Sequence, residues 1–254
     1  IEEIMDENVL CARTLDDQEK VAAMIEKYSL VAIPIIDHEN CLVGIVTVDD
    51  AMTVLQDEAT EDISIMAGVT PNEDSYFGTS VFQHAKNRAL WLMLLMLSAT
   101  VSGEILAHYE SAMAVMPILI TFIPMLMGTS GNCGSQSSTM VIRGIAVGEI
   151  EFKEFFKVVF KEIRIAILVG LMLAVVNGIR VYIMYDQDIM LAIAIGITMI
   201  AIVCMAKCIG CTLPLFAKKI GLDPALMAAP LISTIMDTCT ILMYFAIITA
   251  FFKL

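Results

Sequence analysis

The stretch AAPLISTIMDTCTILMYFAIITAFF, residues 228–252, is the last long apolar run of the chain, and Asp237 is its one charged residue. An ionised carboxylate near the centre of a bilayer costs several kcal/mol unless another group offsets it. A run as apolar as this one does not need an acid in order to fold. Asp237 therefore either pairs with another group or faces water and an ion.

The composition of the whole chain indicates a membrane protein. Hydrophobic residues make up 58% of its 254 residues, whereas a soluble domain contains about 45–50%. The formal net charge is −13, and most of the acidic residues precede Tyr76. An acidic head on a hydrophobic body argues against nucleic acid as a partner and favours membrane lipids and divalent cations.

The hydrophobic body divides into five spans, each with the roughly 20 residues that a helix needs to cross the hydrocarbon core. They lie at residues 89–107, 112–142, 159–183, 189–217 and 226–252. Lys and Arg gather before the first span, between the second and third, and between the fourth and fifth. By the positive-inside rule, we expect a multi-pass protein of the cell (inner) membrane with a cytoplasmic head and its C-terminus outside.

The acidic head, residues 1–57, predicts a small α/β module. VAAMIEKYSL (21–30) has helical periodicity, VAIPIID (31–37) and LVGIVTV (42–48) are typical of strands, and a second helix follows. Such an α–β–β–α unit is too short to bury a good core alone. Because the chain also opens at Ile1 within a polar, acidic stretch, we expect a preceding segment and a sister unit, in that segment or on another chain.

The remaining sequence predicts two further parts. Residues 58–88 contain an acidic helical stretch and a polar linker, which we interpret as a connecting helix, and residues 89–254 hold the five-helix transmembrane domain. The expected fold class is therefore mainly α, with a partial α/β module and a connecting helix before the membrane helices.

Glycine, proline and oxygen-bearing side chains crowd the second span. Pro117, Pro124, Gly128, Gly131 and Gly134 predict a broken helix, and Thr, Ser, Asn and Gln residues follow Gly128 closely. Irregular backbone at membrane depth is tolerated where protein or a water-filled cavity covers it. The polar groups are therefore either contacts between helices or the wall of an ion pathway, and their number favours the pathway.

The seven Cys residues predict no disulfide framework. Cys208 and Cys211 form a CxxC, which is typical of redox or metal chemistry. Small residues also pack helix faces in membranes, and this second interpretation is favoured. The histidines, His38, His84 and His108, are dispersed, and no nucleophile–base pair is evident, so we do not expect an enzyme.

The stretch GIVTVDD, residues 44–50, resembles the end of a CBS (cystathionine-β-synthase-type) motif. The resemblance implies that Thr47 and Asp50 contact the ribose of an adenine nucleotide such as ATP. The alternative is helix capping, because Asp50 lies three residues after Thr47, where a capping-box acid is usually found.

A second resemblance covers nearly the whole chain. GTSGNCGSQSSTMVIRGIAVGEI (128–150) resembles the signature of the MgtE family of magnesium channels and transporters. DEATEDI (57–63), GLDPALMAAPLISTIMD (221–237) and the CBS end at 44–50 match that family in order and spacing.

The MgtE resemblance implies a homodimer with five transmembrane helices per subunit and a pore on the twofold axis. Asp237 matches the acid that holds a hydrated Mg²⁺, and Ser233 lies one turn earlier. Gly128, Gly131 and Asn132 match pore-lining positions of the second helix. Mg²⁺ usually keeps several waters and binds through one or two carboxylates, which suits a symmetric pair of Asp237 side chains.

The resemblance also implies that cytoplasmic Mg²⁺ bound to acidic residues closes the pore. The matching positions are Asp17, Asp50, Glu58, Glu61, Asp62 and Asp223. Ser29 and Thr53 stand where the family has further sensing acids, and Ala229 stands where an Asn can occur.

Two functions stay open at this point. The first is a Mg²⁺-selective channel that imports magnesium and is gated by cytoplasmic Mg²⁺. The alternative is an H⁺- or Na⁺-coupled secondary transporter of Mg²⁺, Mn²⁺ or Co²⁺, in which Glu104 and Lys207 form a relay. Otherwise Glu104 borders the outer mouth, and Lys207 snorkels or pairs.

Overall fold

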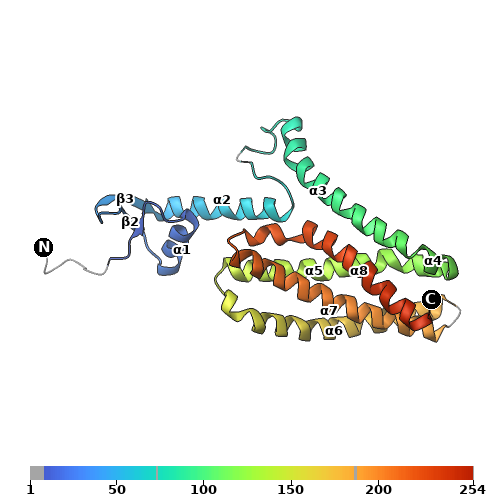
Figure 1. The fold of residues 1–254 in the computed structure, drawn as a ribbon. Coiled ribbons are helices and arrows are strands. Elements are labelled where there is room, and N and C mark those ends of the chain that lie inside the picture. Colours follow the sequence, from blue (N-terminus) through green and yellow to red (C-terminus); the bar gives the residue numbers. More distant parts are fainter. Residues whose placement is uncertain (1–8, 73, 186–187, 254) are drawn as a thin grey trace. The chain divides into compact units, whose positions relative to one another are not determined.

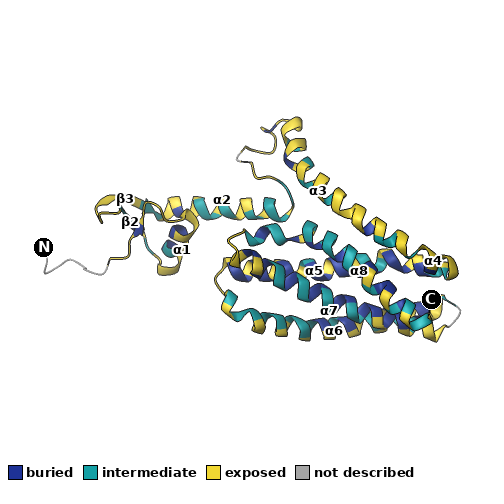
Figure 2. Cartoon of the chain, in the orientation of Figure 1, coloured by how far each residue is buried: buried dark blue, intermediate teal, exposed yellow. Residues whose placement is uncertain are grey.

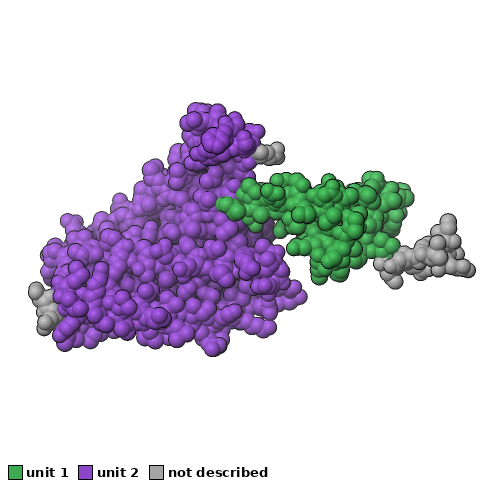
Figure 3. All heavy atoms as spheres, turned by 180° about the vertical axis from the view of Figure 1, so that it is seen from behind, with its two compact units in different colours: residues 1–63 green, residues 64–254 purple. Residues whose placement is uncertain are grey.

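The computed structural model describes residues 9–72, 74–185 and 188–253. It forms two compact units, residues 1–63 and 64–254, which Figure 3 colours separately. The two units are described in turn.

The first unit is a three-stranded sheet with two helices (Figure 1). Its elements are β1 (Ala12–Arg13), α1 (Gln18–Tyr28), β2 (Ala32–Ile36), β3 (Leu42–Thr47) and α2 (Val48–Met66). The sheet order is β1-β2-β3, with β1 parallel and β3 antiparallel to β2. The predicted α–β–β–α order is present, and β1 is an addition that the sequence did not indicate.

Local side-chain chemistry positions these elements. Asp37 Oδ1 accepts hydrogen bonds from the backbone N–H of Glu39 and Cys41, which closes the turn between β2 and β3. At the start of α2, Asp50 Oδ2 accepts from both the backbone N–H and the hydroxyl of Thr47. The unit has a small core, formed by Ala12, Val21, Ala22, Ile25, Ile33 and Ala51.

The second unit is mainly helical, and no strand is present among its described residues. Five long helices, α3 (Val81–His108), α5 (Ile123–Ala146), α6 (Phe155–Met184), α7 (Ile189–Lys219) and α8 (Ala229–Phe252), overlap the five predicted spans. Short elements join them: α4 (Glu110–Val115), η1 (Pro117–Phe122), η2 (Phe152–Glu154) and η3 (Pro224–Met227). Among the described helices, α3, α7 and α8 are long and apolar enough to cross a membrane.

The helix α7 is central in this unit, because it contacts α5, α6 and α8. The hydrophobic core lies along these contacts, and Figure 2 colours the buried residues of these helices dark blue. The helix α3 contacts mainly α8 and is largely exposed, including Leu92, Met96 and Val101. Apolar side chains so exposed are suited to lipid or to a protein partner.

The second predicted span differs from the prediction. Its irregular part is confined to Met116 and η1, and α5 runs unbroken from Ile123 to Ala146 through all its glycines. Pro117 and Pro124 lie in first turns, where a missing N–H costs no hydrogen bond. The prediction of a break within the glycine-rich part was therefore wrong. The helix α7 likewise continues without a break through Pro214.

Candidate cation pathway

The helix α5 has one exposed polar face. Gly128, Asn132, Gln136, Thr139 and Arg143 are exposed and follow one another at intervals of three or four residues, so they share one side of the helix. We call these five residues the polar stripe of α5. A polar stripe on a helix of this unit is a suitable wall for water and ions.

The glycines beside the stripe bring α8 close to α5. A Cβ built on Gly131 would lie 3.4 Å from Ser233 Oγ, and one built on Gly134 would lie 2.7 Å from Ile232 Cγ2. The distance at Gly134 is too short for a Cβ unless Ile232 moves, whereas the distance at Gly131 is an ordinary van der Waals contact. Gly134 thus serves close helix packing, and α5 need not break there.

Hydroxyl groups hold the same interface. Thr240 donates to Ser130 Oγ over 2.6 Å, and both side chains are buried. Ser138 donates to the carbonyl oxygen of Met227, and the Tyr244 hydroxyl donates to the carbonyl oxygen of Leu119 over 2.9 Å. The first bond joins α8 to α5, the second joins α5 to η3, and the third joins α8 to η1.

Asp237 lies on α8 between Ser233 and Thr240, both of which contact α5. Its side chain is half-buried. Within the described residues, its carboxylate makes no hydrogen bond and no ion pair. The structure therefore provides an uncompensated acid at the edge of the α5–α8 interface.

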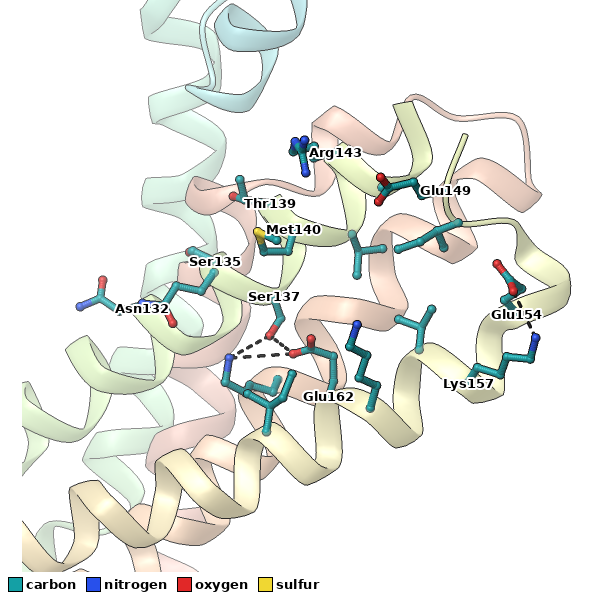
Figure 4. Close-up of a pocket in the computed structure, with 18 residues that line it drawn as sticks. Asn132, Ser135, Ser137, Thr139, Met140, Arg143, Glu149, Glu154, Lys157 and Glu162 are labelled. Atoms are coloured by element: carbon teal, nitrogen blue, oxygen red, sulfur yellow. Dashed lines mark hydrogen bonds and ion pairs between the residues drawn. The ribbon is translucent and has the colours of Figure 1, made fainter. Parts of the chain in front are cut away.

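A second polar cluster joins α5 to α6 and α7. Ser137 Oγ donates to Glu162 Oε2 over 2.6 Å, and Lys207 Nζ donates to Ser137 Oγ over 3.2 Å. Lys207 Nζ also lies 3.9 Å from Glu162 Oε2, and the two charged side chains are only 6% and 13% exposed. Figure 4 shows Ser137 and Glu162 pointing toward each other. We call these three residues the buried triad.

The buried triad lies in the wall of a cavity of about 980 Å³ (Figure 4). Asn132, Gln136, Thr139 and Arg143 of the polar stripe line the same cavity. Further lining residues come from α6 and the turn before it, and they include the exposed ion pair of Glu154 and Lys157. The cavity therefore connects the stripe with the second acid, Glu162.

The predicted pore residues occupy different surroundings. Gly128 and Asn132 belong to the polar stripe, whereas Gly131 is buried against Ser233. Lys207 is paired, as one of its two interpretations anticipated. Sequence reasoning missed Glu162, although an acid near the start of an apolar span was a readable signal.

Several of the predicted Mg²⁺-sensing acids have helix-capping roles. Asp17 caps α1 by accepting from the backbone N–H of Glu19, and Asp223 caps η3 by accepting from that of Ala225. Asp50 accepts from Thr47, which is the capping arrangement. Contact of these two residues with a nucleotide stays a prediction.

Glu58, Glu61 and Asp62 share the second half of α2. Gln18 Nε2 donates to Glu58 Oε1 over 2.7 Å, which brings the start of α1, with Asp17, next to this acidic part of α2. In the described part of the chain, no three His, Cys, Asp or Glu side chains gather as a group that could hold a metal ion. A sensing site in this unit thus stays a prediction.

Comparison with known proteins agrees with this architecture. Residues 123–247 match the family model MgtE, described as a divalent cation transporter, and residues 1–57 match the CBS domain. The chain is thus a protein with a CBS domain followed by a helical domain of the membrane type. The chain belongs to the MgtE family.

Three curated relatives are each named "Magnesium transporter MgtE". The chain is 35% identical to that of Thermus thermophilus over 97% of its own length, 36% to that of Bacillus subtilis over 99%, and 33% to that of Enterococcus faecalis over 100%. It covers 54%, 55% and 55% of these proteins, respectively. The chain thus spans about half the length of the relatives it matches.

Proposed function

We propose that this chain is the ion-conducting part of a protein that carries Mg²⁺ across the cell membrane, with Asp237 holding the ion. The observation that carries the proposal is the half-buried carboxylate of Asp237, which has no partner among the described residues. An ionisable group inside membrane helices is a functional candidate by default, because its cost must be offset. The names of the three relatives support Mg²⁺ as the substrate.

The chemistry of Mg²⁺ suits this arrangement. The ion gives up its waters reluctantly and is held by few carboxylates, with water filling the remaining positions. The hydroxyl of Ser233, one turn before Asp237, and the amide of Asn132 are neutral groups suited to hydrogen bonding with such waters. Asp237 then supplies the charge, and neutral groups supply the water contacts.

A single Asp237 provides only one carboxylate, and we infer that a homodimer supplies the second. Most soluble homo-oligomers close with twofold symmetry, and the same symmetry here would place two Asp237 residues around one ion. The dication offsets the repulsion between two like charges. The edge of the α5–α8 interface that carries Asp237 would then line the axis of the dimer.

We also infer that cytoplasmic Mg²⁺ regulates transport through the first unit, which therefore lies in the cytoplasm. The acids of α2 and the start of α1 repel one another unless cations lie among them. Bound Mg²⁺ would draw these elements together and close the pathway. The contact between Gln18 and Glu58 supports this inference, since it brings α1 beside the acidic part of α2.

A flux experiment tests the proposed transport and separates it from coupled transport. The complete protein is reconstituted into liposomes, and Mg²⁺ current is recorded under opposing Mg²⁺ and proton or Na⁺ gradients. A channel gives a current that reverses at the Nernst potential of Mg²⁺ and ignores the other gradients. Strict dependence on pH or Na⁺ would favour the coupled transporter, and absence of Mg²⁺ flux in the wild-type protein would refute both.

A further inference from the structure

The helices α5 to α8 contain two acidic residues, Glu162 on α6 and Asp237 on α8. Both lie within the described residues, so their surroundings can be compared. Asp237 has no partner among those residues, whereas Glu162 accepts from Ser137 and lies 3.9 Å from Lys207 Nζ. The helices α5 to α8 thus contain one uncompensated and one compensated carboxylate.

Glu162 is surrounded by oxygen donors suited to a cation, in a cavity that also contains the cationic side chains of Lys207, Arg143, Lys157 and Lys161. Its carboxylate, the hydroxyl of Ser137 and the side-chain oxygens of Asn132 and Gln136 all line one cavity. Carboxylate, hydroxyl and amide oxygens are the ligands of hard cations such as Mg²⁺. The cavity also contains the polar stripe of α5, which is the wall of the proposed pathway.

The ammonium group of Lys207 is the positive charge that lies beside Glu162 and Ser137. It is within hydrogen-bonding distance of Ser137 Oγ and near Glu162 Oε2, and the Lys207 side chain is 6% exposed. A buried ion pair is weak evidence for stability, because well-packed apolar residues of similar volume often serve as well or better. The charged pair in this wall therefore indicates a role other than holding the helices together.

We propose that Lys207 is a built-in counter-ion that keeps Glu162 from binding the transported cation. The inference rests on the proposed function, since it assigns Lys207 a role within that pathway. With Lys207 in place, the wall formed by the buried triad is neutral and Asp237 is the one strong cation ligand of α5 to α8. Without Lys207, the freed Glu162 carboxylate forms a second site, which holds ions and slows their passage.

The decisive variant is Lys207→Met, which removes the charge and keeps an apolar side chain of similar length. In liposomes that contain the complete protein, we expect the Mg²⁺ concentration for half-maximal flux to fall by about tenfold and the maximal flux to fall as well. The double variant Glu162→Gln with Lys207→Met removes both charges, and it returns both quantities to the wild-type values. Lys207→Arg retains the charge, so its half-maximal Mg²⁺ concentration and its maximal flux should equal those of the wild type.

The matched control is the exposed pair Glu154 and Lys157, whose charged atoms are 3.2 Å apart on the rim of the same cavity. Glu154→Gln with Lys157→Met, and Lys157→Met alone, leave the half-maximal concentration unchanged, because solvent already screens that pair. An equal shift in Lys157→Met and Lys207→Met would overturn the proposal, since it would reflect general surface charge.

Direct binding separates this inference from the proposed function. Mn²⁺ serves as the probe, and its binding to the purified protein is counted by electron paramagnetic resonance in an Asp237→Asn background. Adding Lys207→Met should create one further Mn²⁺ site per chain, and adding Glu162→Gln should abolish it. This result does not depend on transport, so it can hold even if the wild-type protein fails the flux test.

Two outcomes overturn the inference. One is an unchanged Mn²⁺ count and unchanged half-maximal concentration in folded Lys207→Met. If Lys207→Met does not fold, Lys207→Gln carries the same expectation, because it retains a donor for Ser137 without the charge. The other is that Lys207→Met and Lys207→Gln both fail to fold while the double variant, Glu162→Gln with Lys207→Met, folds and transports as the wild type does. In that case the pair of Lys207 and Glu162 serves folding alone.

Discussion

Asp237 and Glu162 are acids on two helices of one bundle, α8 and α6, yet their surroundings differ. Glu162 has a hydroxyl donor and a buried ammonium group beside it, and Asp237 has neither among the described residues. Both are expensive at membrane depth unless offset. The difference teaches that the partners, and not the residue type, decide whether a membrane acid is structural or available to an ion. Two substitutions test this contrast, and two more test the helix contacts near the two acids.

The largest expected effect is that of Asp237→Ala on transport. We expect Mg²⁺ flux to fall at least about a thousandfold, equivalent to about 4 kcal/mol, because no other uncompensated acid lies on α5 to α8. The apparent unfolding temperature should not fall, since no described group loses a partner. Flux into liposomes and thermal unfolding in detergent measure the two effects. Normal Mg²⁺ flux in Asp237→Ala would contradict the central proposal.

Unlike Asp237→Ala, Glu162→Ala should lower the stability of the protein. It leaves the buried Lys207 ammonium without its counter-charge, so we expect a loss of stability of about 3 kcal/mol. Thermal unfolding in detergent measures this loss. The comparison variant is Glu154→Ala, which breaks the exposed pair with Lys157 and should change stability by less than about 1 kcal/mol. Equal stability of these two variants would remove the contrast between Glu162 and Asp237.

Gly210→Ala tests the helix contact next to the buried triad. A Cβ on Gly210 would lie 2.3 Å from the carbonyl oxygen of Gly134, which is backbone and cannot rotate away. We expect a loss of about 2 kcal/mol from overpacking, measured as a lower unfolding temperature. Gly103→Ala on α3 is the control, because its Cβ meets nothing within 4 Å. Similar behaviour of the two variants would show that α5 and α7 are not in close contact there.

Thr240→Val has the smallest expected effect. It removes the hydroxyl that donates to Ser130 across the α5–α8 interface and should cost about 1 kcal/mol. Thr249→Val is the matched control, since the Thr249 hydroxyl bonds only to carbonyl groups of its own helix. Thermal unfolding of both variants measures the difference. If both lose the same stability, the hydroxyl contact between the helices contributes nothing.

The sequence predicted the long helices well because their signal is local. Runs of apolar residues mark α3, α7 and α8, and these helices overlap the predicted spans. Hydropathy does not reveal which helix is surrounded by others. Within an apolar stretch of 18 residues, 6% of the residues are buried in α3 and 44% are buried in α7. Burial depends on packing partners from distant parts of the chain.

The glycine-rich segment was recognised for its composition but interpreted wrongly. Glycine permits both a break and a close approach of helices, and local sequence does not distinguish them. The structure decides for close approach, with Gly131 against Ser233 and Gly134 against Ile232. The strand β1 escaped prediction for a related reason. It is two residues long and exists by pairing with β2.

The sequence by itself determined the apolar helices, the Thr47–Asp50 capping arrangement and the presence of a costly acid at Asp237, because each depends on residues near one another in the chain. Tertiary structure alone decided that Lys207 meets Glu162 through Ser137, and that Asp237 has no such partner among the described residues. A charge can be read from one residue. Its compensation depends on three helices that meet in space.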